Sequence, residues 1–293
     1  MKVKSKRYSL DWEMLEEQKK TMEDLVAEII NDPELTELEE LVIGQFTVGY
    51  DDEENMDTII KGLVDNKEKL QHIKSFYFGD MDSEECEVSW ITQGNYTPIW
   101  GAFPNMEELT IKGANALTLG KISHSRLKSL MLINGGLEKA VLAEIRDADL
   151  PALETLVIFL GDDNYGANIN KEEIEDFGNN AKLPALQGLG LVNSYIQDEI
   201  VEAILKTSIA KRCEELNFSY GALTDKGAQV IIEAMAGLSE LMQIDIEHHY
   251  VSRVMQKKVI AAGNQHGINV VFDDQQEAEV YSGETYYSIL LSE

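Results

Sequence analysis

Cysteine is scarce in this chain of 293 residues, which has only Cys86 and Cys213 and no Cys-x-x-Cys pair. This argues against a disulfide framework and against a thiolate zinc site. Long hydrophobic runs are also missing, since no apolar segment approaches the ~20 residues that a membrane span needs. The N-terminal segment is charged and lacks the apolar stretch of a signal peptide. These absences predict a soluble cytoplasmic protein.

Basic residues are also few compared with acidic ones. The chain has 25 basic residues against 53 acidic ones, and its formal net charge is −28. Such a field repels nucleic-acid phosphates and anionic lipid head groups, so we expect neither nucleic acid nor a membrane as partner. A basic protein partner is compatible with it. With 44% hydrophobic residues the chain can still bury a substantial core, unlike a disordered acidic polymer.

The sequence does contain a repeated pattern of apolar residues, L-x-x-L-x-L, as in LETLVI at 153–158. The middle apolar residues of nine such segments are Leu41, Phe76, Leu109, Leu130, Leu156, Leu189, Leu216, Ile244 and Val270. The number of residues between these successive markers is typical of repeat proteins, in which each unit buries its apolar face only by stacking on its neighbours. We therefore expect seven to nine short strands in one parallel sheet, with the return segments on its outer face.

Several return segments have the periodicity of amphipathic helices. Residues 197–207 and 224–237 each place apolar side chains on one stripe, and 56–73 is similar. The interval from Leu109 to Leu130 is short, so we expect an irregular or extended return there.

The two ends of such an array need caps, because a terminal repeat exposes the edge of the core. Residues 9–31 predict an amphipathic helix within an N-terminal helical cap at 1–36. The repeats occupy 37–274, and a C-terminal cap or tail follows at 275–293, in which YYSILL (286–291) predicts an extra strand or a docking tail. The whole is expected to be one structural domain.

The unit LNFSYGALTDKGAQVIIEAMAGLSELMQID resembles the ribonuclease-inhibitor-like class of leucine-rich repeats. The segments ECEVSWITQG, NGGLEKAVLAEI, LGDDNYG and DIEHHYVS are similar to a family of uncharacterised bacterial cytoplasmic leucine-rich-repeat proteins. The resemblance implies an α/β solenoid with a curved parallel sheet on the concave face and with helices and irregular returns on the convex face. Genes of that family often lie beside radical-SAM and ATP-grasp enzymes. The resemblance therefore implies an accessory role beside a biosynthetic enzyme system, and it brings no catalytic residues.

The chain departs from the usual repeat at one turn position, where such proteins place a ladder of asparagines. The residues at this position are Phe46, Met81, Ala114, Gly135, Gly161, Ser194, Gly221 and His249. We expect these turns to be held by glycine conformations and backbone hydrogen bonds instead.

The concave face of the sheet is the candidate partner site. Side chains that alternate with the core residues face this side. Its centre is predicted to be apolar, through Tyr77, Met131, Ile133, Val157, Phe159 and Val192, and its C-terminal end is acidic through Asp245 and Glu247. This pattern fits a protein or peptide with an apolar centre and a basic flank. In a duller alternative, the chain's own tail covers the strip.

Two further groups of residues are candidate sites. Glu84, Glu85 and Glu87 indicate a solvated rim, beside which Trp90 and Trp100 are candidate partner anchors. A metal or catalytic site is the alternative function, centred on Asp245, Glu247 and His249, which share one face if the strand runs straight. We favour a turn in which His249 donates to a backbone carbonyl, and we expect no cofactor.

Overall fold

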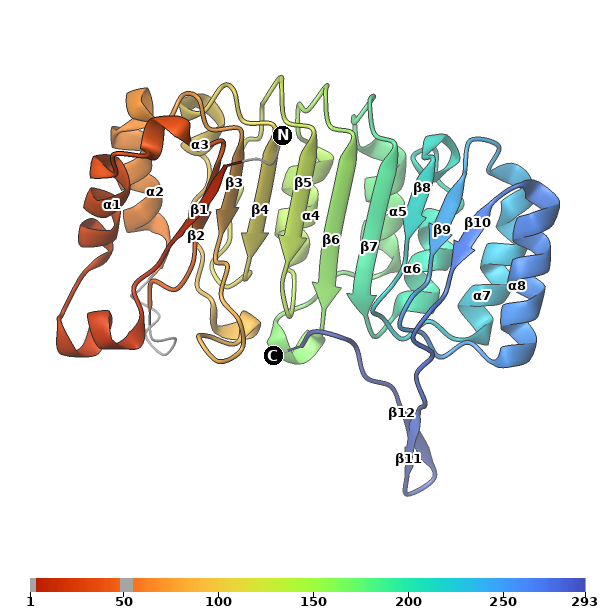
Figure 1. Cartoon of the computed structure of the whole chain (residues 1–293). Coiled ribbons are helices and arrows are strands. Elements are labelled where there is room, and N and C mark those ends of the chain that lie inside the picture. The colour runs from red at the N-terminus through yellow and green to blue at the C-terminus, as the bar shows by residue number, and fades with distance from the viewer. Residues whose placement is uncertain (1–3, 48–54, 293) are drawn as a thin grey trace.

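The computed structural model describes residues 4–47 and 55–292, and its centre is a ten-stranded parallel β-sheet (Figure 1). Strand order follows chain order, so each repeat adds one strand beside the previous one. The strands are β1 (Ser5–Tyr8), β2 (Glu40–Ile43), β3 (Ser75–Phe78), β4 (Glu108–Lys112), β5 (Ser129–Ile133), β6 (Thr155–Gly161), β7 (Gly188–Ser194), β8 (Glu215–Asn217), β9 (Gln243–Asp245) and β10 (Asn269–Val271). A separate antiparallel hairpin, β11 (Glu279–Tyr281) with β12 (Glu284–Tyr286), follows β10.

The register of the sheet is the one that the apolar repeat predicts. All nine marker residues pair side by side across the sheet, from Leu41 opposite Phe76 to Ile244 opposite Val270. From Leu41 to Ile244 each marker is at most 1% exposed. One side chain per strand therefore points into the same continuous core, as stacked repeats require.

The first strand was not predicted. Strand β1 pairs with β2 and places Lys6 opposite Leu41, inside the segment expected to be a helical cap. Polar groups close the core at this end, because Lys6 Nζ forms a salt bridge with Asp32 and Tyr8 Oη donates to Asp32 Oδ2 at 2.6 Å. An edge strand with a lysine at the marker position lacks the L-x-x-L-x-L pattern, so the sequence does not reveal it.

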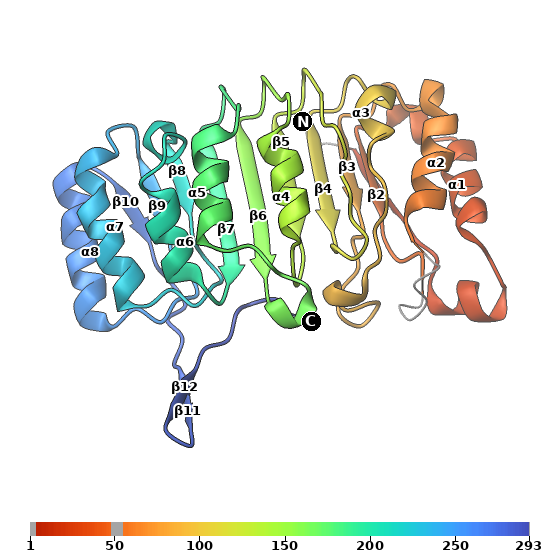
Figure 2. The ribbon, with the colours of Figure 1, turned by 180° about the vertical axis from the view of Figure 1, so that it is seen from behind.

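The helices cover one face of the sheet, and the other face is left open (Figure 2). They are α1 (Met22–Asn31), α2 (Asp57–Asp65), α3 (Ile99–Ala102), α4 (Lys139–Arg146), α5 (Lys171–Asn180), α6 (Gln197–Ile204), α7 (Asp225–Ala234) and α8 (Arg253–His266). The predicted returns at 56–73, 197–207 and 224–237 contain α2, α6 and α7. Thr224 caps α7 by accepting from the N–H of Lys226.

The single helix expected over 9–31 is instead two short ones. A π-helical turn at Glu13–Glu17 ends before Lys19, whose φ is 55°, and α1 begins after Thr21. Thr21 and Asp24 form a reciprocal capping box, which satisfies two N-terminal N–H groups and starts a new helix.

The short return between β4 and β5 has no helix, as predicted. Thr118 forms a parallel bridge with Asn95, and Ser123 forms one with Asp149. Extended segments therefore replace a helix on this part of the outer face.

Buried polar side chains hold several of the turns. Gln93 Nε2 donates to the carbonyl of Lys112 at 2.5 Å, and Asn134 Nδ2 donates to that of Phe159 at 2.8 Å. Glycine also contributes as expected, since Gly161 has a φ of 77°. Buried amide side chains and glycines thus take the place of the asparagine ladder, because any buried donor of suitable reach satisfies a turn carbonyl.

Candidate binding surface

The open face, meaning the sheet face turned away from the helices, presents the predicted inner row in register. The row runs Val42, Tyr77, Thr110, Met131, Val157, Gly190, Asn217, Asp245 and Val271, each opposite the next across neighbouring strands. Arg7 of β1 extends it by one place opposite Val42. The structure therefore brings Tyr77, Met131, Val157 and Asp245 onto one surface.

A second row lies two residues further along each strand. Ile133 pairs with Lys112, and Phe159 pairs with Val192. The ring of Phe159 stacks on that of Tyr220, with centroids 6.0 Å apart. We call Tyr77, Met131, Ile133, Val157 and Phe159 the apolar strip, and all five are half-buried. Val192, the sixth residue expected there, is 0% exposed and so offers no surface to a partner.

A hollow interrupts the open face beside the apolar strip. Gly188 and Gly190 lack side chains there and leave a cavity of about 110 Å³, lined also by Val157, Glu215 and Asp245. The space takes the end of one side chain. Its walls are a valine on one side and carboxylates on the other, which suits a side chain with an apolar stem and a cationic tip.

Asp245 stands in an environment that disfavours its charge. Burial raises the pKa of this carboxyl, the backbone N–H of Glu247 opposes the rise, and the charge of Asp273 adds to it. Asp245 Oδ1 accepts from that N–H at 2.9 Å. A partner cation placed here relieves the unfavourable charge, so this end of the open face favours a basic group.

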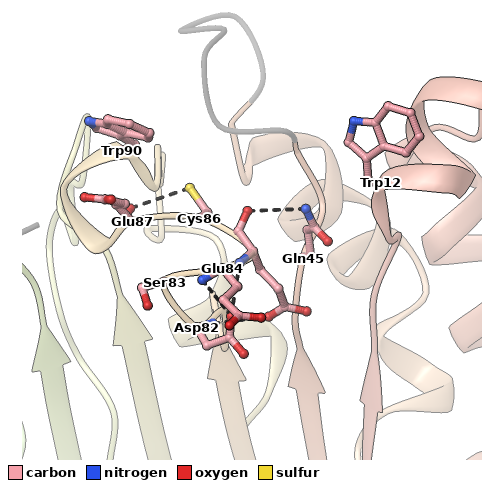
Figure 3. Close-up of a pocket in the computed structure, with 9 residues that line it drawn as sticks. Trp12, Gln45, Asp82, Ser83, Glu84, Cys86, Glu87 and Trp90 are labelled. Atoms are coloured by element: carbon pink, nitrogen blue, oxygen red, sulfur yellow. Dashed lines mark hydrogen bonds between the residues drawn. The ribbon is translucent and has the colours of Figure 1, made fainter.

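A larger cavity of about 620 Å³ lies at the carboxyl ends of the first strands (Figure 3). Trp12 and Trp90 stand on opposite sides of it and are 59% and 42% exposed. Between them the wall is acidic, formed by Asp82, Glu84, Glu85 and Glu87 with Gln45, Ser83 and Cys86. Indole faces and carboxylates together are the groups that bind an organic cation such as an arginine or lysine side chain.

Only part of this acidic wall is neutralised within the chain. Arg7 Nη2 donates to both carboxylate oxygens of Glu85, at 2.8 and 2.6 Å, and Arg7 Nε donates to Asp80 at 3.1 Å. In the described part of the chain, Asp82, Glu84 and Glu87 form no salt bridge. The cavity therefore has an excess of negative charge.

The tryptophans differ from expectation. Trp100 is 5% exposed, lies in α3 and donates its indole N–H to the carbonyl of Leu119 at 2.8 Å, so it is a core residue and not a partner anchor. Trp90 is exposed as expected. The sequence did not indicate that Trp12 lines this cavity, because Trp12 is far from Trp90 along the chain. Only the fold places the two on opposite sides of the cavity.

His249 makes the structural contact that the turn hypothesis predicts. It is 0% exposed, and the N–H of Val251 donates to its Nδ1 at 3.0 Å. Its Nε2 therefore carries the proton and donates to the carbonyl of Phe272 at 3.1 Å. With both nitrogens engaged, this ring has no lone pair for a metal. Among residues 4–47 and 55–292, no group of three or more His, Cys, Asp or Glu side chains is placed to hold a metal ion.

Among solved structures, the chain is similar to a protein from Bacteroides fragilis whose crystal structure was determined by the Northeast Structural Genomics Consortium. The two are 32% identical, the match covers 100% of this chain and 78% of that one, and the TM-score is 0.84. The chain belongs to the same family as this Bacteroides protein. No protein-family model and no curated protein matches the chain.

None of the helices formed by residues 4–47 and 55–292 is long and apolar enough to span a bilayer.

Proposed function

We propose that the protein is a non-catalytic leucine-rich-repeat scaffold that binds a protein or an extended peptide on the concave face of its solenoid. The resemblance of its repeats to bacterial cytoplasmic leucine-rich-repeat proteins supports an accessory role beside a biosynthetic enzyme system. The observation that carries the proposal is the apolar strip, five half-buried apolar side chains on strands β3, β5 and β6 of the open face.

The charges around the strip favour the type of partner. Asp245 and Glu215 border the hollow near the C-terminal end of the open face. Near its N-terminal end, the cavity between Trp12 and Trp90 has carboxylates that form no salt bridge in the described part of the chain. The net charge of −28 draws basic partners toward the protein from a distance. The partner has an apolar centre with basic groups on its flanks.

The free energy available from an apolar patch limits the affinity that it can support. A patch of ~300–600 Å² is the size that marks a functional surface on a monomer. At ~25 cal/mol per Å² its burial contributes about 8–15 kcal/mol before the cost of association, which is itself ~4–15 kcal/mol. The apolar strip alone gives weak binding, so the basic flanks must supply part of the specificity.

A library of displayed random peptides tests this proposal without requiring that the natural partner be identified first. Peptides selected on the wild-type protein should carry an apolar centre flanked by lysine or arginine. Their binding should be lost in the double variant Val157→Glu with Phe159→Glu, whose side chains are half-buried on the open face, while the melting temperature is kept. Val254→Glu is the matched control, because Val254 is 69% exposed on α8, away from the open face.

The result that overturns the proposal is equally concrete. Selected peptides that bind the double variant as tightly as the wild-type protein place the partner site elsewhere. Selection of acidic peptides refutes the electrostatic part of the argument.

A further inference from the structure

The last described residues of the chain dock on the carboxyl edge of the sheet. We call residues 287–292 the tail; it returns from the hairpin toward the ends of the central strands (Figure 1). Asn193 holds it reciprocally, because Asn193 Nδ2 donates to the carbonyl of Leu291 at 2.6 Å and the N–H of Leu291 donates to Asn193 Oδ1 at 2.9 Å. The N–H of Leu290 donates to the carbonyl of Tyr220 at 3.0 Å. The tail is thus bound through its backbone, as an extended peptide ligand is.

Further contacts fix the two ends of the tail. Tyr250 Oη donates to the carbonyl of Ser288 at 2.9 Å and accepts from its N–H at 2.8 Å. The ring of Tyr287 packs edge-on against that of Tyr250, with centroids 4.8 Å apart. At the other end, a β-carbon on Gly135 would come within 2.4 Å of the carbonyl oxygen of Ser292, so glycine is needed for this close approach.

The backbone beneath the tail is in an uncommon conformation. Asn193, near the end of β7, has a φ of 59°, and Tyr220, just beyond the end of β8, has a φ of 68°; the two positions are equivalent in the register of the sheet. A left-handed tyrosine is sterically disfavoured, and such positions concentrate at binding sites. Here each one directs a group at the tail: the side-chain amide of Asn193 and the carbonyl of Tyr220. We call Asn193, Tyr220, Tyr250 and Gly135 the tail seat.

The tail seat adjoins the apolar strip. Val192 precedes Asn193 and pairs with Phe159, yet it is 0% exposed. Ile289 of the tail is also buried, at 7%. Neither belongs to the hydrophobic core between the sheet and the helices. Next to Val192 on this face are the tail that Asn193 binds and the rings of Phe159 and Tyr220, which stack on each other from the two strands that flank β7.

The segment that leads to the tail has little to hold it. The hairpin β11–β12 projects beyond the edge of the sheet (Figures 1 and 2), and Val280 and Tyr281 are 72% and 74% exposed. A lone two-stranded hairpin is marginally stable in water. Because Val192 and Ile289 do not belong to the core between sheet and helices, we expect that core to be unchanged when the tail leaves its seat.

We propose that the tail is a displaceable internal occupant of the partner surface, which closes the Val192 end of the apolar strip. A partner that uses the whole strip must displace it. This second statement rests on the proposed function, whereas the coverage of Val192 by the tail does not.

Thiol accessibility at position 192 tests the coverage. Val192→Cys is made in the full chain and in a chain that ends at Tyr286, and the rate of reaction with a maleimide is measured in both. The native thiols give a low background, because Cys86 and Cys213 are buried and burial raises the pKa of each to about 11. Removal of the tail should accelerate the reaction of V192C by about tenfold or more, as release of local protection does.

Val157→Cys in both chain lengths is the matched control, since Val157 lies on the same face and is already half-buried in the full chain. Its reaction rate should be unchanged by truncation. Equal rates for V192C in the two chains overturn the proposal. So does an equal acceleration of V192C and V157C, which reports general loosening of the sheet.

A chain of full length gives a second, independent measurement. In Tyr250→Phe with Asn193→Asp the hydroxyl contact is removed and a carboxylate faces the carbonyl of Leu291, while asparagine and aspartate both tolerate a left-handed backbone. The V192C thiol should react faster in this background and stay protected in Tyr281→Phe, a change on the exposed hairpin. Protection that survives the two seat substitutions contradicts the role of the tail.

Displacement is tested with the tail itself as probe. A labelled peptide of residues 284–292 should bind the chain that ends at Tyr286 saturably, and bind the full chain at least about tenfold more weakly because the tethered tail competes at high effective concentration. Equal binding to both chains refutes an internal occupant. If these tests fail, the proposed binding of a partner on the open face is unaffected. If the selected peptides do not bind the apolar strip, the coverage of Val192 by the tail is unaffected.

Discussion

Replacement of His249 by leucine is expected to destabilise the protein without touching the open face. The imidazole is fully buried, accepts from the N–H of Val251 and donates to the carbonyl of Phe272 just after the last strand of the sheet. Leucine has a similar volume and fills the space but leaves both backbone groups without a partner. The structure thus isolates the cost of two lost hydrogen bonds from that of a cavity.

The size of the effect follows from those two groups. A buried donor or acceptor that loses its partner costs about 1–3 kcal/mol, and the more apolar side chain returns about 1–2 kcal/mol through its burial. We expect a net loss of about 3 kcal/mol in the free energy of unfolding. For 293 residues that unfold as one unit, this lowers the melting temperature by about 5 °C, which calorimetry or circular dichroism resolves easily.

His249→Asn is the graded control. Asparagine keeps an acceptor near the position of Nδ1 but does not reach as far as Nε2, so its loss should lie between zero and that of leucine. Two results would refute the reasoning: a His249→Leu variant as stable as the wild type, or folded variants that both lose a bound metal. The second result revives the site of Asp245, Glu247 and His249.

Two other outcomes follow from the core. Leu216→Asp should leave the chain unfolded in a circular dichroism melt, because it places a charge between stacked repeats at a position 1% exposed; a wild-type melting temperature would mean that the register is wrong. Acidification from about pH 7 to pH 5 should lower the free energy of unfolding measured in urea. Burial holds the pKa of His124 and of His249 below the ordinary 6.5, so below that pH the unfolded chain binds more protons than the folded one. A flat profile, or the same slope in His249→Asn, would contradict this assignment.

The register of the sheet was predictable because it depends on a local repeat of apolar residues. Residues such as Leu130 and Leu156 repeat the same spacing, and each repeat needs only its neighbour to bury them. The helices at 197–204 and 225–234 were predictable for the same reason, since their apolar stripes are local. Strand β1 was not, because Lys6 stands at a marker position and its role depends on Asp32.

The sequence by itself determined the repeat, its register and the side chains that alternate between core and open face, because these follow from periods of two and 3.6 residues along the chain. Only the tertiary structure decided which of those side chains are accessible. Val192 carries the same pattern as Phe159 but is fully buried, beside an asparagine that binds the chain 98 residues further on. Trp12 and Trp90, from different repeats, likewise line one cavity from opposite sides. Contacts at such sequence separation depend on how the ends of the chain return to the sheet, and no local spacing encodes that.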